Sequence, residues 1–339
     1  MLRLIFILIA SILLCSAGEA QTPMKDSIPF NHFQWLATHN SYHIAPPPPL
    51  RDLINAYSEG GGDALNYTFP PLHAQLDAGI RGLELDLYND PQGGLYARPF
   101  ALKFAAAAQI DEENLRKPGF KILHSPDFDV LTTVPTLRLA LGELRAWSDA
   151  NPHHAPILVQ LELKTESFSA ISPPDFDAAA LKKLESEIRE EMPLEKILTP
   201  DEVRGDCATL REAVTTRGWP DLGQTRGKFL FALDNEDKIR DRYLALSPQS
   251  DLKNRLCFVS VAPTEAAAAW MKRNDPIASF DDIRALVKTG FVVRTRADEN
   301  LKEVSQGTLH RFEKAVQSGA QWISTDAPES YPSDPFPAF

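Results

Sequence analysis

The segment Gly82-Leu83-Glu84-Leu85-Asp86-Leu87 alternates apolar residues with two carboxylates. A period of two is typical of a β-strand, so Glu84 and Asp86 are expected on one face of it. In an antiparallel sheet this alternation would mean that one face is solvated. In a parallel strand covered on both faces, it places two carboxylates inside the protein, where they need a cation or a metal ion as partner. A solvated edge strand is the alternative that the segment alone leaves open.

Seven further short apolar runs have the length and composition of strands in a sheet that is buried on both faces. Helical patterns lie between several of them, at 136–150, 176–192, 264–274 and 308–318. This alternation predicts an α/β protein with a single (β/α)₈ TIM-type barrel, regular or distorted. An open doubly wound sheet is disfavoured, because no glycine-rich nucleotide loop follows an early strand. The seven runs are 33–37, 120–123, 157–163, 228–233, 256–261, 291–295 and 322–324.

The overall composition restricts the class of protein and of ligand. With 339 residues, 43% hydrophobic and 24% charged, the chain has an ordinary globular composition, which excludes collagen, a coiled coil or a disordered tail. The formal net charge of −11 disfavours nucleic acid and polybasic attachment to anionic lipid, since both need positive potential. An anionic substrate would therefore need a bound cation that reverses the local field.

The first twenty residues are typical of an export signal. Arg3 precedes the apolar run 4–14, and small residues follow it. The run is short for a bilayer span, so an uncleaved anchor is the less favoured alternative. We expect a secreted protein, periplasmic or extracellular, with 1–20 as signal peptide and 21–339 as one catalytic domain. In an oxidising compartment Cys207 and Cys257 could pair, although Cys257 lies in an apolar run and also suits a buried small hydrophobe.

Oxygen donors are expected together at the carboxyl ends of the predicted strands, which meet at one mouth of a parallel barrel. Glu84 and Asp86 belong to the second strand, Glu162 to the fourth, and Asn40 directly follows the first. Three carboxylates and one amide oxygen form an all-oxygen set, which suits Ca²⁺ and also permits Mg²⁺. The sequence therefore predicts a hard divalent cation at the mouth.

Two histidines and several cations are expected at the same end. His39 follows the first strand and His124 the third, and a pair of imidazoles is suited to base and acid catalysis near neutral pH. Lys164, Arg294 and Arg296 are candidates for substrate binding, although either arginine could instead pair with Asp298. The remaining histidines have no comparable setting and are interpreted as surface or packing residues: His32, His43, His73, His153, His154 and His310.

Several motifs together resemble a known family. The segments THNSY (38–42), GIRGLELD (79–86), KILH (121–124), LELK (161–164) and STDAP (324–328) are similar to those of the secreted Ca²⁺-dependent phosphatidylinositol-specific phospholipases C, PLC-like phosphodiesterases of the TIM-barrel superfamily. The resemblance implies a distorted barrel and phosphodiester cleavage. It matches Lys164 to a position near phosphate or metal. It matches His39 and His124 to catalytic residues, and it matches four residues to Ca²⁺ ligands: Asn40, Glu84, Asp86 and Glu162.

The expected reaction is cleavage of a glycerophospholipid, phosphatidylinositol, by attack of a metal-activated neighbouring hydroxyl on the phosphodiester. In this scheme His39 stabilises the developing charge and His124 assists proton transfer, while a neighbouring carboxylate is an alternative base. Contact with a membrane surface would be transient. Two other functions stay open: a glycerophosphodiester phosphodiesterase, which usually has His-Arg-Gly where this chain has His39-Asn40-Ser41, and a catalytically silent lipid-binding barrel.

Overall fold

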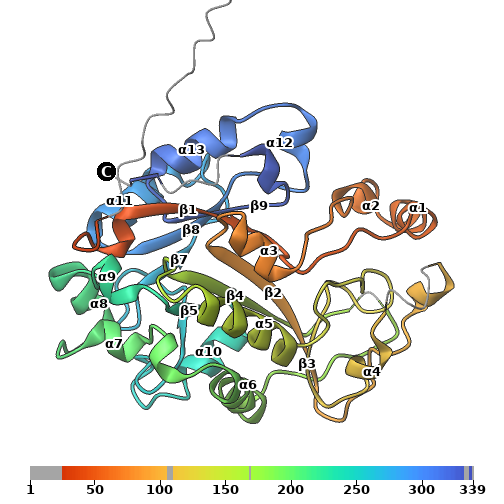
Figure 1. Cartoon of the computed structure of the whole chain (residues 1–339), viewed down its shortest axis with the longest axis horizontal. Coiled ribbons are helices and arrows are strands. Elements are labelled where there is room, and N and C mark those ends of the chain that lie inside the picture. The colour runs from red at the N-terminus through yellow and green to blue at the C-terminus, as the bar shows by residue number, and fades with distance from the viewer. Residues whose placement is uncertain (1–24, 105–109, 168, 332–335, 338–339) are drawn as a thin grey trace, which may run out of the picture.

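A computed structural model describes residues 25–104, 110–167, 169–331 and 336–337, so the signal expected at 1–20 lies outside the described residues. Eight parallel strands form a nearly closed barrel, which confirms the predicted fold (Figure 1). Their hydrogen-bonded order is β6-β5-β4-β2-β1-β9-β8-β7. The strands are β1 (Phe33–Thr38), β2 (Gly82–Asp90), β4 (Ile157–Lys164), β5 (Phe229–Leu233), β6 (Cys257–Val259), β7 (Trp270–Lys272), β8 (Val292–Arg296) and β9 (Trp322–Thr325).

The barrel is distorted at the seam between β6 and β7, the two ends of the hydrogen-bonded order. There the backbone N–H of Lys272 donates to the side-chain oxygen of Ser260 at 3.2 Å. The prediction of a helix over 264–274 is wrong, because Trp270 and Met271 are fully buried and pair in parallel with β8. The alanines before them favour a helix locally, but burial of the two large side chains selects the strand.

The apolar run at 120–123 is not a barrel strand, which corrects a second prediction. It forms β3 (Gly119–Ile122), which pairs antiparallel with the end of β2, with Ile122 opposite Leu87. β2 is nine residues long and continues beyond its pairing with β1, and β3 returns along this extension toward the barrel. A further short strand, β10 (Phe336–Pro337), pairs antiparallel with β1.

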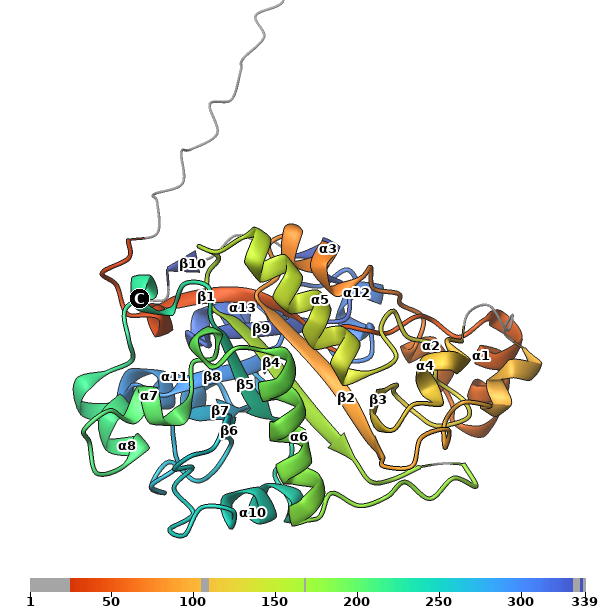
Figure 2. The same ribbon diagram turned by 60° about the horizontal axis from the view of Figure 1, so that its bottom comes forward.

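Helices surround the barrel, as Figures 1 and 2 show. The helices predicted at 136–150, 176–192 and 308–318 are confirmed as α5 (Leu137–Ala150), α6 (Ala178–Glu191) and α13 (His310–Ser318). The other helices around the barrel are α3 (Leu72–Asp77), α7 (Pro200–Arg204), α8 (Leu210–Glu212), α9 (Leu222–Thr225), α10 (Lys238–Leu244), α11 (Phe280–Thr289) and α12 (Lys302–Ser305). In the described part of the chain, no helix is long and apolar enough to cross a membrane.

A second, smaller hydrophobic core lies beside the barrel. It joins α1 (Pro48–Tyr57) to α4 (Glu112–Leu115) and to the segment that follows β3, through side chains that include Leu50, Leu115 and Leu131. With α2 (Gly61–Ala64) these elements form a side lobe, which stands away from the barrel helices in both views (Figures 1 and 2). The side lobe therefore packs against the extended end of β2 rather than against the barrel wall.

The two cysteines of the described chain are unpaired. Cys257 is fully buried in β6, and burial raises the pKa of its thiol. Cys207 lies half-buried in the loop after α7. The interpretation of Cys257 as a small buried hydrophobe is therefore confirmed, and the alternative of a bridge is not, because the structure leaves both sulfurs free.

Candidate active site

The end of β1 lies close to the start of β2, and this brings the turn after β1 to the acidic strand. A Cβ at Gly82 would lie 2.5 Å from the Cβ of Ala37, so the approach requires glycine. Asn40 then adopts a left-handed backbone with φ of 48°, which asparagine tolerates better than most residues. Its side chain is buried: Nδ2 donates to the Tyr67 hydroxyl at 3.1 Å, while Oδ1 has no hydrogen-bond partner among the described residues.

The predicted acidic residues converge inside the mouth. Asp86 on β2 is in register with Glu162 on β4, and carboxylate oxygens of Glu84, Asp86 and Glu162 lie within 4.8 Å of one another. Both oxygens of Asp86 are buried and accept no hydrogen bond from the described part of the chain. Lys164 contacts this cluster as an ion pair, with Nζ 2.8 Å from Glu162 and 3.2 Å from Asp86.

The carboxyl groups of this cluster outnumber its cations. Burial and the charge of Asp86 raise the pKa of Glu162 to about 8, although Lys164 opposes the shift. Glu84 accepts hydrogen bonds from Arg294 and, at 3.0 Å, from Gln160. Three carboxyl groups thus face two cations, and in the absence of a metal ion the raised pKa leaves Glu162 largely protonated at neutral pH. Neither the Asp86 carboxylate nor the amide oxygen of Asn40 accepts a hydrogen bond from the described residues. This oxygen set fits a hard divalent cation such as Ca²⁺.

His39 is held by a buried carboxylate from the last barrel strand. Its Nδ1 lies 2.7 Å from Asp326, and its Nε2 lies 3.6 Å from Glu84. Arg296 donates to the other oxygen of Asp326 at 3.0 Å. Burial would raise the pKa of Asp326, but His39 and Arg296 together hold it below its usual value. Because the ionised carboxylate accepts from Nδ1, the Nε2 of His39 faces the acidic cluster. In the sequence Asp326 belongs to the segment STDAP (324–328), which carries the family resemblance but indicates no role for this residue.

His124 reaches the mouth by a different route from the one expected. His124 follows β3. Because β3 runs antiparallel to the extended end of β2, its last residues lie closer to the barrel than its first. The Nδ1 of His124 lies 2.8 Å from Asp129, and its side chain is 30% exposed. Burial alone would lower the pKa of His124, but the hydrogen bond and charge of Asp129 raise it. Asp127, the nearer carboxylate in sequence, instead accepts from the backbone of Phe100 in the side lobe.

The structure also brings His43 into this group, although its pattern indicated only a surface or packing residue. His43 is fully buried, with Nε2 3.0 Å from Asp129 and Nδ1 3.0 Å from the carbonyl oxygen of Tyr67. No spacing in the sequence reveals these contacts, since they join three separate loops. The other five histidines are exposed or, for His154, buried far from the cluster: His32, His73, His153, His154 and His310.

Both candidate arginines lie in the mouth, and neither pairs with Asp298. Arg294 donates to Glu84 and to Asn274, and Arg296 donates to Asp326. Asp298 instead accepts from the backbone N–H of Asp326 at 3.0 Å. Both guanidinium groups therefore bind carboxylates that flank His39, and there they add positive potential.

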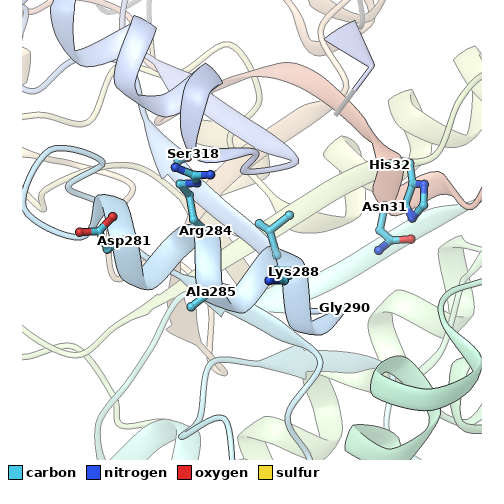
Figure 3. A pocket seen from close by; sticks show the side chains of 9 residues that line it. Asn31, His32, Asp281, Arg284, Ala285, Lys288, Gly290 and Ser318 are labelled. Carbon is cyan, nitrogen blue, oxygen red and sulfur yellow. The ribbon is translucent and has the colours of Figure 1, made fainter. Parts of the chain in front are cut away.

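A separate groove of about 590 Å³ lies at the opposite end of the barrel (Figure 3). Asn31 and His32, which precede β1, line it together with Arg284 and Lys288 of α11 and with Gly290, which precedes β8. None of the predicted site residues lies there. Because active sites of parallel barrels form at the carboxyl ends of the strands, the candidate site remains the mouth.

The barrel and its mouth define an α/β-barrel protein with a candidate hard-metal site flanked by histidines. The chain belongs to the family described as phosphoinositide phospholipase C, Ca²⁺-dependent, whose model matches residues 28–336. This confirms the resemblance found in the sequence.

Solved structures also show that the fold is similar to that of known proteins. A calcium-dependent phosphoinositol-specific phospholipase C from Pseudomonas sp. superposes with a TM-score of 0.60 at 14% identity, over 93% of this chain and 97% of that one. A Ca²⁺-dependent phosphatidylinositol-specific phospholipase C from Streptomyces antibioticus has a TM-score of 0.60 at 18% identity, over 91% and 99%. A PI-PLC X domain-containing protein of Arabidopsis thaliana is 32% identical over 77 residues, which span 22% of this chain and 16% of that relative.

Proposed function

We propose that this protein is a Ca²⁺-dependent phosphodiesterase of the phospholipase C type and that it cleaves phosphatidylinositol. The observation that carries the proposal is the convergence of His39 and His124, each held by a buried carboxylate, on one mouth with the acidic cluster. Membership of the Ca²⁺-dependent family supports it. A cation bound by the acidic cluster would reverse the local field and so allow this acidic protein to bind an anionic phosphodiester.

Four residues would hold Ca²⁺, with Mg²⁺ as the less favoured ion: Asn40, Glu84, Asp86 and Glu162. When bound, the ion lowers the pKa of a coordinated hydroxyl and neutralises charge on phosphate. In the proposed reaction, a neighbouring hydroxyl oxygen of the head group bonds to phosphorus, and the bond from phosphorus to the glycerol oxygen breaks. The hydroxyl loses its proton to a base, and the glycerol alkoxide gains one from an acid.

The histidines are suited to different parts of this reaction. His39 presents Nε2 to the acidic cluster, and in the protonated ring this nitrogen would donate to the phosphate and stabilise the charge that develops there. His124 is more readily protonated than a free imidazole, which suits the acid that protonates the leaving oxygen. Glu84 lies 3.6 Å from His39 and is the neighbouring carboxylate best placed as an alternative base. Lys164, Arg294 and Arg296 would contribute positive potential to phosphate binding.

The proposal extends to location. The apolar run at 4–14 and the small residues after it support export, and the reaction would then take place in the periplasm or outside the cell, at a membrane surface contacted transiently. Fractionation of expressing cells, followed by mass measurement of the mature N-terminus, tests this. A protein that keeps residues 1–20 and stays with the cytoplasm would contradict it.

The decisive experiment is product analysis with phosphatidylinositol vesicles, in Ca²⁺ and in chelator. A cyclic inositol phosphate with diacylglycerol, formed only with Ca²⁺, is the expected result. Free glycerol phosphate from glycerophosphodiesters would instead indicate a glycerophosphodiester phosphodiesterase. Vesicle binding without any product would indicate a silent lipid-binding barrel.

A further inference from the structure

A third histidine is built into the mouth. We infer that His43 is a positioning residue that acts on His124 through Asp129; this inference rests on the proposed function and deepens it. The Nε2 of His43 lies 3.1 and 3.0 Å from the two oxygens of Asp129. One of these oxygens, Oδ2, also lies 2.8 Å from Nδ1 of His124. Asp129 is therefore shared between a buried imidazole and a partly exposed one.

The donors and acceptors fix the roles within this chain of contacts. The Tyr67 carbonyl oxygen can only accept, so Nδ1 of His43 donates to it. The carboxylate of Asp129 is ionised, because the charges of His43 and His124 hold its pKa well below its usual range despite burial. Both ring nitrogens of His43 therefore face oxygen atoms, Nδ1 that of the Tyr67 carbonyl and Nε2 those of the Asp129 carboxylate. In the described chain, the side chain of Asp129 has no hydrogen-bond donor besides the two histidines. Its orientation toward His124 thus depends on His43.

His43 belongs to the turn after β1, whereas His124 belongs to the loop after β3. The backbone N–H of His43 donates to Asn40 at 2.9 Å, and its ring packs on Tyr67 with centroids 4.4 Å apart. Asp129 and His124 lie in the loop that follows β3, and neighbouring residues of this loop pack in the core of the side lobe. His43 therefore ties that loop to the turn that carries His39 and Asn40. A catalytic imidazole gains from such support because small misplacements of a reacting group are costly in rate.

Two amide variants separate positioning from simple burial. In His43→Gln the terminal amide nitrogen replaces the donor toward Asp129, whereas in His43→Asn the shorter side chain reaches only the Tyr67 carbonyl. We expect kcat on phosphatidylinositol to stay near wild type in H43Q and to fall about 10- to 100-fold in H43N. KM should be unchanged in both, because His43 is fully buried. His154→Asn is the matched control: it removes a buried histidine bonded to Ser148 and Ala155, and should lower Tm without changing kcat.

A signal independent of turnover completes the test. In protein labelled with ¹⁵N-histidine, the Nδ1–H resonance of His124 reports its hydrogen bond to Asp129. It should persist in H43Q and be lost to solvent exchange in H43N. Equal resonances, or equal kcat values, in the two variants would overturn the inference. If the wild type cleaves no phosphatidylinositol, the proposed function fails, and the resonances alone decide whether His43 positions His124.

Discussion

Asp326→Asn is expected to destabilise the fold strongly, because it breaks a buried charge pair. The side chains of Asp326 and Arg296 are 2% and 11% exposed, and their charged atoms lie 3.0 Å apart. At an effective dielectric constant of about 20, that separation corresponds to an attraction of about 5.5 kcal/mol. The amide keeps the shape but leaves the guanidinium without its counter-charge, and removing one partner of a buried pair typically costs about 3–5 kcal/mol. We expect a loss of that size in the free energy of unfolding.

Asp282→Asn is the matched control. Asp282 also accepts from an arginine, Arg273, at 2.6 Å, but its side chain is 52% exposed, and pairs of this kind contribute about 1 kcal/mol or less. Urea unfolding of both variants, with unchanged m-values, gives the comparison. The pKa of Asp326 is lowered in the folded protein, so its contribution should be lost as the pH falls below the ordinary aspartate range. Equal losses in D326N and D282N would refute the reasoning.

Two further predictions concern the mouth. His39→Ala should leave the protein folded, with a lower Tm because Asp326 loses a hydrogen bond, and should lower kcat by about 10²-fold or more; retained turnover would remove His39 from the mechanism. Glu162→Gln should abolish the stabilisation by Ca²⁺, which in the wild type reaches about 2.7 kcal/mol at a hundredfold excess over Kd. In chelator, the folded wild type keeps a proton on Glu162 that the unfolded chain releases, so its stability should fall between about pH 5 and pH 8, and that of E162Q should fall less. Thermal unfolding across this range would contradict the assignment if both proteins gave parallel curves.

Strand periodicity was sufficient for the parts of the site that lie on barrel strands. The alternation at Glu84 and Asp86 predicts that both project inward, and the parallel register then places Asp86 beside Glu162. Asn40 and His39 follow directly from the end of β1. These residues could be brought together from the sequence because the carboxyl ends of parallel strands share one edge. Their chemical roles remain predictions.

Periodicity could not give the direction of a strand or the partner of a loop residue. β3 has the composition of a barrel strand but runs antiparallel, and nothing local records its direction. β7 is preceded by alanines that favour a helix. Asp129 and His43 belong to loops whose contacts depend on tertiary packing, and nothing in the sequence favours Asp129 over Asp127 as the partner of His124. The missed features are thus those fixed by contacts distant in sequence.

The two histidines of the mouth are supported by different parts of the fold. His39 and Asp326 are 287 positions apart and meet because β1 pairs with β9, so their contact exists only when the barrel has joined its first and last strands. His124 and Asp129 are five positions apart and can meet within one loop, but that loop is placed by the side lobe. The loop with His124 and Asp129 therefore has to pack against the part of the barrel that holds His39 and Asp326. Backbone hydrogen bonds from Thr133 to Tyr42 and from Ile44 to Leu131 join this loop to the turn after β1. The buried contact between Asp129 and His43 is the side-chain connection between the same two segments, and it is the one that reaches His124.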